Sequence, residues 1–451
     1  MPIVIVLIFG VLIWGVSLSK MDYISKGALL VYFGFWGITL LLSSLNLLGI
    51  NAIHSSTFSL LILHIFAFYL GYNLIKIPNS YALESSKSLS LQQQIDRLMH
   101  SSWFRILLVA LTVYSITLFV IYFQKITIYN NLADLRAEYY DGNNMYGESY
   151  RALNQWLLKP FSIFVTPLFA YLSFTRRDKY FWILCVFLLV YNTLSAGRFG
   201  YVKIAIGFIY VIVCLIPTLR KNFRSWVTIS LVLVSIFFLI MITTVARLDS
   251  FGTASEMTGT GKEIMGENAI LSITQPVASL DYAIDRDYVG RVGGYQFGGM
   301  TFTSIEHFVN PFLRKIGMDF HLSSSKLDFK QDEYIDIGYI RNQNALYTAV
   351  LWYYLDFGWF GAIIFPFLFG FIIRKAIKLF YMKQSLSFAI LVGFFFQLML
   401  FSVFDFYITA ESDLLFIIML WWMGSTSSYN NQRISLPIIL YCAFALIFTQ
   451  L

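Results

Sequence analysis

The chain has 451 residues, of which 58% are hydrophobic, 18% aromatic and 13% charged, and its mean hydropathy is +0.68. Because soluble domains carry about 25% charged residues, this composition excludes a soluble globular protein and indicates lipid as the solvent over most of the chain. The net charge of +7 does not indicate a nucleic-acid partner, because the basic residues occur in short clusters between apolar runs and not along one face.

Twelve apolar runs are long enough for membrane helices, which need about 20 residues each. In chain order they are 2–18, 27–50, 57–75, 105–123, 156–174, 180–196, 200–219, 226–246, 345–373, 385–404, 412–428 and 434–450. The first run lacks the basic start and the cleavage site of a secretory signal, so we expect it to be a retained span. The sequence therefore predicts an all-α polytopic membrane protein with about twelve transmembrane helices.

The loops between these runs differ in charge. If every run crosses the membrane, the loops rich in Lys and Arg all fall on one side, which the positive-inside rule assigns to the cytoplasm. The opposite side carries a middle-sized hydrophilic segment, 124–155, and a long one, 247–343. Long connections tend to be functional. We therefore expect helices in 1–246, one large extracytoplasmic loop over 247–343, and helices again in 344–451.

Within the large loop, the run 301–316 predicts a short amphipathic helix lying against the membrane surface. Its apolar positions share one face at helical spacing, namely Phe302, Ile305, Val309, Phe312, Leu313 and Ile316. His307, Asn310 and Arg314 share another face, whereas Pro311 argues against an uninterrupted helix.

Other motifs point away from metal and nucleotide chemistry. The stretch GTGKE at 259–263 departs from the phosphate-loop pattern on both sides of its Gly-Lys pair, and the histidines and cysteines form no zinc-ligand pattern. Asp285-Arg286-Asp287 has the spacing of a metal-binding aspartate pair, but its centre is basic. We therefore expect neither a metal nor a cofactor.

The outer side is rich in arginine, the residue that binds phosphate groups in bidentate fashion and keeps its charge. Its members are Arg136, Arg151, Arg198, Arg247, Arg286, Arg291, Arg314 and Arg341. Such a set above a membrane fits a lipid diphosphate, and ordinary salt bridges with the outer acids are the alternative. Arg198 stands out because it lies at the membrane edge between two spans, where a charge needs a partner or must reach the interface.

The segment 334–361 combines polar groups with an apolar run. Polar residues crowd the outer end of the ninth span, namely Asp336, Arg341, Asn342, Gln343 and Asn344. Asn344, Tyr347 and Thr348 are expected to share one helix face. Asp356 lies inside the apolar run, followed by Phe-Gly. It marks either a functional acid within the span or a place where the helix breaks near an interface.

Three stretches of the chain carry a recognisable pattern, namely NALYTAVLWYYLDFGWFGAIIFPFLFGFI, LSAGRFGY, and SLDYAID followed by GGYQFGGMTFTSI. They resemble the closing motif, the turn between two spans and the large outer loop of the O-antigen and capsule repeat-unit polymerases, the Wzy-type family. The resemblance covers roughly 180–375. It implies a fold similar to the C-type glycosyltransferases and a relation to the O-antigen ligases. It also implies a multi-pass protein of the bacterial inner membrane with its active site on the periplasmic or outer face.

The resemblance implies that the protein moves a growing glycan from its undecaprenyl diphosphate carrier onto a new lipid-linked repeat unit. No cofactor is needed, because the diphosphate linkage stores the driving force. We expect Arg198 and Arg341 to stabilise the charge that develops on the leaving diphosphate. Asp336 and His307 are candidates for the base that activates the acceptor hydroxyl. The expected substrate-binding residues are Arg286, Arg291, Arg314, Asn344 and Tyr347.

Two other functions remain open. An O-antigen ligase performs the same chemistry on a lipid A core, but the histidine that ligases carry before the Asn of this helix is missing from 338–343, which reads GYIRNQ. A lipid-linked oligosaccharide flippase or transporter usually shows repeat symmetry and charges within its spans, and this sequence shows no repeat and few such charges. The expected partners are lipid-linked donor and acceptor glycans, membrane lipid and a polysaccharide chain-length regulator, with no nucleic acid.

Overall fold

The computed structural model describes residues 1–77, 85–129, 146, 150, 153–175, 179–194, 199–215, 261–318, 323–327, 334–335, 337–338, 343–344, 347–405 and 411–426. These residues are helical almost throughout. Two short strands, β1 (Tyr334–Ile335) and β2 (Gln343–Asn344), pair antiparallel within the large loop.

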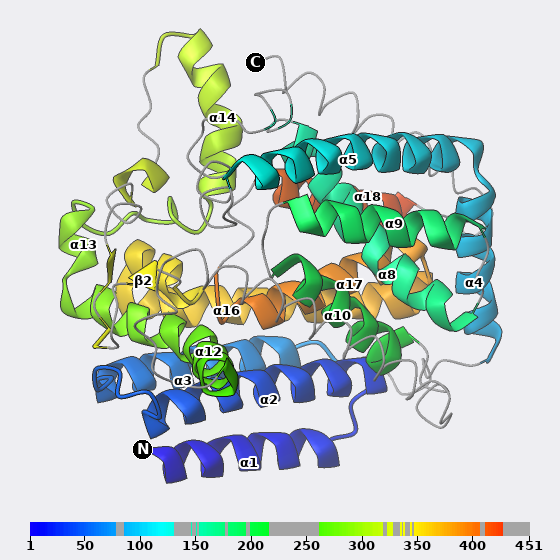
Figure 1. Ribbon diagram of the computed structural model, residues 1–451. Helices are drawn as coiled ribbons and strands as arrows, with labels where there is room; N and C mark the ends of the chain where they lie inside the picture. The colour runs from blue at the N-terminus through cyan, green and yellow to red at the C-terminus, as the bar shows by residue number, and fades with distance from the viewer. Residues whose placement is uncertain are drawn as a thin grey trace. The chain divides into compact units, whose positions relative to one another are not determined.

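The helices follow one another along the chain as Figure 1 shows. They are α1 (Pro2–Leu18), α2 (Tyr23–Leu45), α3 (Ser55–Asn73), α4 (Ser85–His100), α5 (Ser102–Tyr129), the π-helical turn η2 (Asn154–Leu158), α8 (Lys159–Thr175), α9 (Lys179–Leu194), α10 (Phe199–Tyr210), the π-helical turn η3 (Val211–Leu215), α12 (Gly261–Asp285), α13 (Tyr288–Arg291), α14 (Thr303–Lys315), the 3₁₀ helix η7 (Ser323–Leu327), α16 (Val350–Lys383), α17 (Leu386–Phe401) and α18 (Glu411–Thr426).

Five of the described helical segments are long and apolar enough to cross a membrane, namely Tyr23–Leu45, Ser55–Asn73, Ser102–Lys125, Asn154–Thr175 and Val350–Lys383. Shorter apolar helices cover Pro2–Leu18, Lys179–Leu194, Gly200–Val213, Leu386–Phe401 and Ser412–Ser425. Each overlaps a range in which the sequence predicts a span, and the predicted spans 226–246 and 434–450 lie outside the described residues. The chain thus has the helical build of an α-helical, multi-pass membrane protein.

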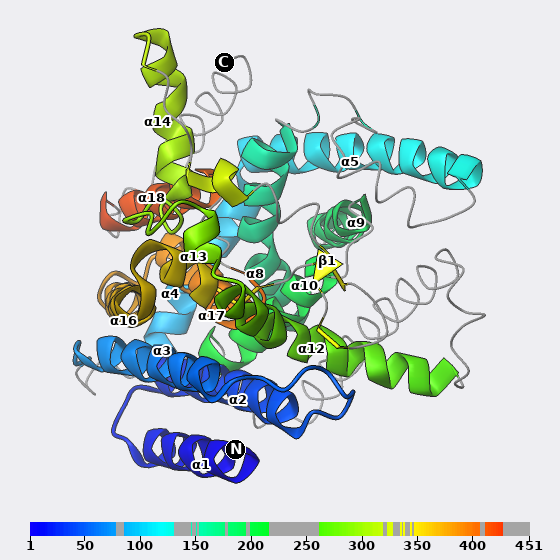
Figure 2. The same ribbon diagram turned by 90° about the vertical axis from the view of Figure 1, so that its left-hand side faces the viewer.

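The chain divides into two compact units. The first comprises Met1–Ala82, Lys262–Met382 and Phe395–Ile418, and the second comprises Leu83–Gly261, Lys383–Phe394 and Met419–Leu451. Most of 247–343, the predicted large outer loop, therefore belongs to the first unit, together with α1, α2, α3 and α16. In both views α1 lies alongside α2 (Figures 1 and 2).

The backbones of α3 and α16 approach closely in the first unit. A Cβ atom on Gly71 would collide with the backbone carbonyl of Phe367, and one on Gly370 would collide with the backbone of Phe68. Small residues allow such approaches between membrane helices, where dispersion contacts between backbones stabilise the pair. These two glycines therefore determine how close α3 and α16 can lie.

About one turn beyond Gly370, a buried ion pair ties α16 to the start of α2 and to the segment after α3. The Arg374 guanidinium donates to the Asp22 carboxylate at 2.7 Å, to the Ile75 carbonyl at 3.0 Å and to the Ser25 hydroxyl. It also lies over the Tyr72 ring, 5.3 Å from its centre. A charge inside a membrane protein needs such partners, because its desolvation is costly.

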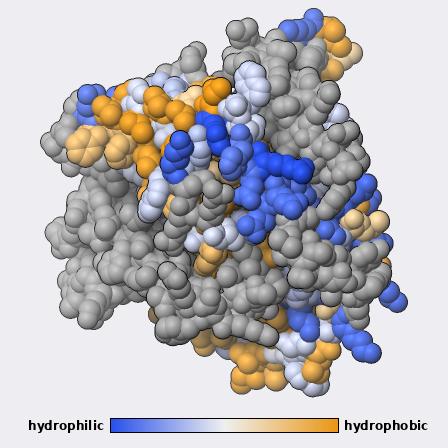
Figure 3. Space-filling view, turned by 90° about the vertical axis from the view of Figure 1, so that its right-hand side faces the viewer, coloured by the Kyte–Doolittle hydropathy of each residue, from blue (hydrophilic) through white to orange (hydrophobic). Residues whose placement is uncertain are grey.

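The second unit contains an amphipathic helix, α4, in the segment that the charge pattern assigns to the cytoplasmic side. Its apolar residues Leu91, Ile95, Leu98 and Met99 are buried, and its polar face is exposed. The Gln94 side chain bridges the Gln384 carbonyl and the Leu386 N–H at 2.8 Å each, and so caps the start of α17. Figure 3 shows hydrophilic surface on the side on which α4 lies in Figure 1.

Candidate functional site

The helix α16 is broken directly after Asp356. Phe357 has φ −144° and ψ 20°, and Gly358 has φ 59° and ψ −136°, a left-handed φ that favours glycine. At the break, the carbonyls of Leu355 and Asp356 accept hydrogen bonds from the outer loop, from Gln296 N at 3.0 Å and from Phe297 N at 3.2 Å. The break therefore provides the backbone acceptors that receive the loop.

The Asp356 side chain holds the same part of the loop. It is completely buried, and its two oxygens accept from the backbone N–H groups of Met300 at 2.9 Å and of Thr301 at 2.7 Å. A buried carboxylate is tolerated when it receives hydrogen bonds of this kind. The sequence left open whether Asp356 is a functional acid within the span or marks a helix break. The helix does break there, and the buried Asp356 joins the outer loop to α16.

Beyond this turn the loop continues into α14. The helix predicted over 301–316 is confirmed as Thr303–Lys315, with Pro311 inside it. Glu306 accepts from both the backbone N–H and the hydroxyl of Ser323, at 2.8 Å each, and so caps η7. Several apolar residues of the predicted stripe are exposed, namely Phe302, Ile305, Val309 and Ile316. An exposed apolar stripe of this kind agrees with a helix that contacts lipid.

A group of two arginines and three tyrosines lies around the junction of α12 and α13. It is called here the arginine–tyrosine cluster, and its members are Arg286, Arg291, Tyr282, Tyr288 and Tyr347. The buried Tyr288 hydroxyl lies 3.0 Å from the hydroxyl of Tyr347, just before α16. The Arg291 guanidinium lies over the Tyr288 ring, 5.1 Å from its centre, and Arg286 lies 5.4 Å from the centre of the Tyr282 ring. Tyr282 meets Tyr288 edge to face, with ring centres 6.5 Å apart.

This geometry places two cations beside aromatic rings. A tyrosine ring attracts a guanidinium through its π face, whereas the N–H donors lie in the plane of the guanidinium. Both arginines are exposed, so an anion can reach them. The two arginines can therefore recognise phosphate or carboxylate groups.

Asp287, next to the cluster, has a structural role. Asp287, with φ 45°, caps the start of α13, and its side chain accepts from the Gly290 N–H at 3.1 Å. It belongs to the Asp-Arg-Asp stretch whose spacing resembles a metal site. Within the described residues, no group of three or more His, Cys, Asp or Glu side chains is placed to hold a metal ion.

A histidine–aspartate pair, which sequence reasoning missed, joins the start of α3 to α12. The Asp281 carboxylate accepts from the backbone N–H of His54 at 3.1 Å and from the Thr57 hydroxyl, and it lies 3.0 Å from Nδ1 of His54. The Asp281 side chain is 11% exposed, whereas the His54 ring is 63% exposed. The hydrogen bond to Asp281 and its negative charge raise the pKa of His54, and Asp285 adds to the effect.

The loop before α3 also contacts the segment that holds two predicted catalytic residues. The Asn51 N–H donates to the Ile337 carbonyl at 2.6 Å. Gly338, with φ 79°, packs so closely on Asn51 that a Cβ atom would collide with its side chain. His54 is three residues from this contact, so the His54–Asp281 pair and residues 337–338 belong to one region of the first unit.

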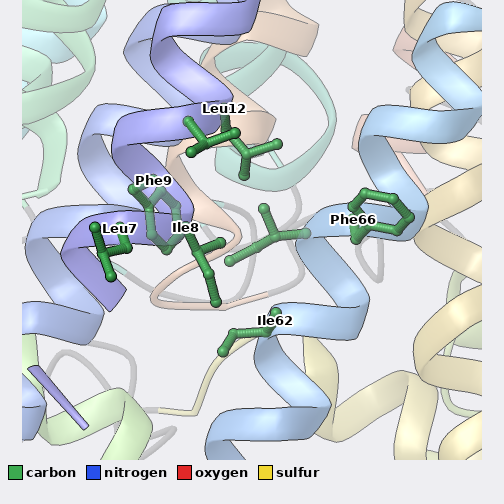
Figure 4. A pocket seen from close by; sticks show the side chains of 8 residues that line it. Leu7, Ile8, Phe9, Leu12, Ile62 and Phe66 are labelled. Atoms are coloured by element: carbon green, nitrogen blue, oxygen red, sulfur yellow. The ribbon is translucent and has the colours of Figure 1, made fainter. Parts of the chain in front are cut away.

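An apolar groove lies between α1 and α3 (Figure 4). Its volume is about 350 Å³, and its lining is Leu7, Ile8, Phe9, Val11, Leu12, Ile62, Ile65 and Phe66. Ile62 follows His54 by eight residues, which corresponds to about 12 Å along a helix at 1.5 Å per residue. The groove therefore begins about two turns along α3 from the His54–Asp281 pair.

The predicted site residues fall into three groups, apart from Asn344, which lies in β2. The first group, Arg198, Asp336 and Arg341, lies outside the described residues. The arginine–tyrosine cluster unites Arg286, Arg291 and Tyr347, whereas His307 and Arg314 lie on α14.

One prediction about this segment needs correction. The helix face predicted for Asn344, Tyr347 and Thr348 does not form, because Asn344 pairs with Tyr334 in the small sheet and α16 begins only at Val350.

Compared with known protein families, curated proteins and solved structures, the chain shows no match.

Proposed function

We propose that the chain is a repeat-unit polymerase that transfers a growing glycan from undecaprenyl diphosphate to the end of a new lipid-linked repeat unit. In this proposal it has about twelve spans and a fold similar to the C-type glycosyltransferases. It acts at the outer face of a bacterial inner membrane. The multi-pass helical build and the three stretches that resemble such polymerases support this function over that of a soluble enzyme.

The arginine–tyrosine cluster is the observation that carries the proposal. Two of its members, Arg286 and Arg291, present exposed guanidiniums, and a third, Tyr347, lies in the stretch that resembles the closing motif of the polymerases. A lipid diphosphate carries adjacent negative charges, which a pair of fixed arginines can bind in bidentate fashion. We assign these two arginines to diphosphate binding, with Arg314 on α14 as a further contact.

Catalysis requires charge stabilisation on the leaving group. As the glycosidic bond breaks, the diphosphate oxygen gains negative charge, and a guanidinium placed near it lowers the barrier because it binds the transition state more tightly than the ground state. Arg198 and Arg341 are assigned to this role. Loss of one such group commonly lowers a rate by about 10²–10³.

The apolar groove of α1 and α3 fits the other half of such a substrate. An isoprenoid tail has no polar groups along its length, and the groove is lined by eight apolar side chains. The groove begins about 12 Å from His54, at 1.5 Å per residue along α3. A lipid-linked sugar requires such a distance between the site of its apolar tail and the site of its head group. We therefore place the tail of one substrate in this groove.

The first test is a gel of surface polysaccharide from a strain that lacks the gene. A polymerase predicts the collapse of the ladder to core plus a single repeat unit. Complete loss of polysaccharide from the lipid A core, with long chains still on the undecaprenyl carrier, indicates the ligase instead. Accumulation of single units facing the cytoplasm indicates the flippase.

Complementation of that strain then tests the arginines. Arg291→Ala and Arg198→Ala are expected to leave single repeat units without a ladder. Arg97→Ala removes an exposed arginine on α4, and it should restore the ladder. A normal ladder from Arg198→Ala and Arg291→Ala contradicts the assignment of these residues.

A further inference from the structure

The His54–Asp281 pair has the geometry of a general base whose ring is oriented by a carboxylate. Asp281 lies 3.0 Å from Nδ1 of His54, and the backbone N–H of His54 donates to the same carboxylate at 3.1 Å. These two contacts fix both the position of the residue and the orientation of its ring. The neutral ring then carries its proton on Nδ1, next to the carboxylate, and Nε2 is the proton acceptor.

The surroundings of this ring differ from those of an ordinary structural histidine. The carboxylate is buried and receives a further bond from Thr57, whereas the imidazole is mostly exposed. The charged groups of the described residues that act on His54 are Asp281 and Asp285, both on α12. These two negative charges favour a ring that takes up a proton.

The pair also lies where an acceptor sugar is expected. Through Asn51, the loop before α3 contacts Ile337 and Gly338, a few residues before the stretch from Asn344 onward that resembles the closing motif of the polymerases. In the other direction, the apolar groove begins about 12 Å along α3 at 1.5 Å per residue. With the donor's tail in this groove, its first sugar, whose anomeric carbon is attacked, lies at the level of His54, and the acceptor hydroxyl at the end of the new repeat unit must reach the same place.

We propose that His54 is the general base for the acceptor hydroxyl and that Asp281 is the positioning residue that holds it. This role rests on the proposed polymerase function and differs from the candidates Asp336 and His307. The acceptor oxygen forms a bond to the anomeric carbon of the donor sugar, while the bond from that carbon to the diphosphate oxygen breaks. The leaving diphosphate takes the bonding electron pair, and the hydroxyl proton goes to Nε2 of His54.

The test uses purified full-length protein in lipid nanodiscs, with undecaprenyl-diphosphate-linked repeat units isolated from the strain that lacks the gene. Polymer formation is followed as an initial rate against pH. For the wild type, the rate should rise with pH and reach a plateau above the pKa of His54. His54→Gln should lower the rate by about 10²–10⁴, the usual contribution of a general base, and should abolish the rise.

Asp281→Asn tests the positioning role. Removing the negative charge lowers the pKa of His54, so the rise should move to lower pH, and the plateau should fall because the ring is no longer held. Thr57→Val removes a bond to the same carboxylate without changing the imidazole. Its melting temperature should fall at least as much as that of His54→Gln, while its pH-dependent rise persists. His100→Gln changes an exposed histidine on α4 and should leave the pH profile unchanged.

The outcomes separate two kinds of failure. If the wild type forms no polymer from these substrates, the polymerase function fails, and the base assignment fails with it. If the wild type is active and His54→Gln keeps both its rate and its pH-dependent rise, the base assignment alone is overturned. Equal losses in rate for His54→Gln and Thr57→Val, at equal losses of melting temperature, would show a structural role and overturn it as well.

Discussion

Replacing Asp356 with alanine should release the outer loop from the break in α16. The carboxylate accepts from the N–H groups of Met300 and Thr301, and both residues are buried. A buried donor without a partner costs about 1–3 kcal/mol, so two donors cost about 2–6 kcal/mol. This is a large part of the roughly 5–15 kcal/mol that stabilises a typical protein.

The isosteric change Asp356→Asn separates the loss of hydrogen bonds from the loss of volume. The amide oxygen still accepts from one backbone N–H, but the amide NH₂ faces the other, so we expect about half the effect, roughly 1–3 kcal/mol. Asp405 offers a matched control in the same unit. It accepts from the Trp352 indole at 3.0 Å and is partly exposed. Asp405→Ala should therefore cost only about 0.5–1.5 kcal/mol.

The assay combines thermal unfolding in detergent with limited proteolysis. Asp356→Ala should lower the melting temperature more than Asp356→Asn, and both should expose new cleavage sites within 293–318. Asp405→Ala should leave that segment as resistant as it is in the wild type. Wild-type melting and wild-type cleavage in Asp356→Ala would show that the carboxylate does not hold the loop, and the account of this motif would then be wrong.

Three further predictions concern the first unit. Arg374→Ala should destabilise the protein by about 3–5 kcal/mol, because it leaves the buried Asp22 carboxylate without its cation, and Arg374→Ala with Asp22→Asn should recover part of this loss in thermal unfolding. Gly71→Leu should prevent the close approach of α3 and α16 and yield protein that aggregates on size-exclusion chromatography, whereas Leu63→Ala on the exposed face of α3 should not. The raised pKa of His54 contributes stability that is complete below about pH 6.5, the ordinary histidine pKa, and that is lost as pH rises through the folded pKa. His54→Gln should therefore lower the melting temperature more in acid than at alkaline pH, and an equal loss at every pH would contradict this reasoning.

Most helices could be predicted because their signal is local. The predicted span 2–18 coincides with α1, and the predicted span 385–404 encloses α17, because an apolar run of membrane length is contained in the sequence itself. The end of α16 was predicted too early, at 373. The helix continues to Lys383, and Arg374, the first residue beyond the predicted end, pairs with Asp22, a partner 352 residues away in the chain. No window of the sequence contains that information.

The candidate site also contains both contacts that are local in the sequence and contacts that are not. Arg291 and Tyr288 are three residues apart, so their contact follows from helical spacing and could have been predicted. His54 and Asp281 are separated by 227 residues, and neither has neighbours that distinguish it from other polar residues at the end of a helix. The amphipathic pattern of α4, with Leu91, Ile95 and Leu98 on one face, was present in the sequence but was interpreted as part of a loop.

Polar contacts at three of the described places join the large outer loop to α3 and α16. Asp281 holds the start of α3, Tyr288 meets Tyr347 at the start of α16, and the turn at Met300 binds Asp356 at the break. Binding residues are most effective on loops that a rigid scaffold positions, because a small displacement of a reacting group is costly. In the proposed polymerase, these contacts hold the arginine–tyrosine cluster and His54 at fixed places along α3 and α16. Loosening any one of them should therefore lower the rate even where the residue itself never meets the substrate.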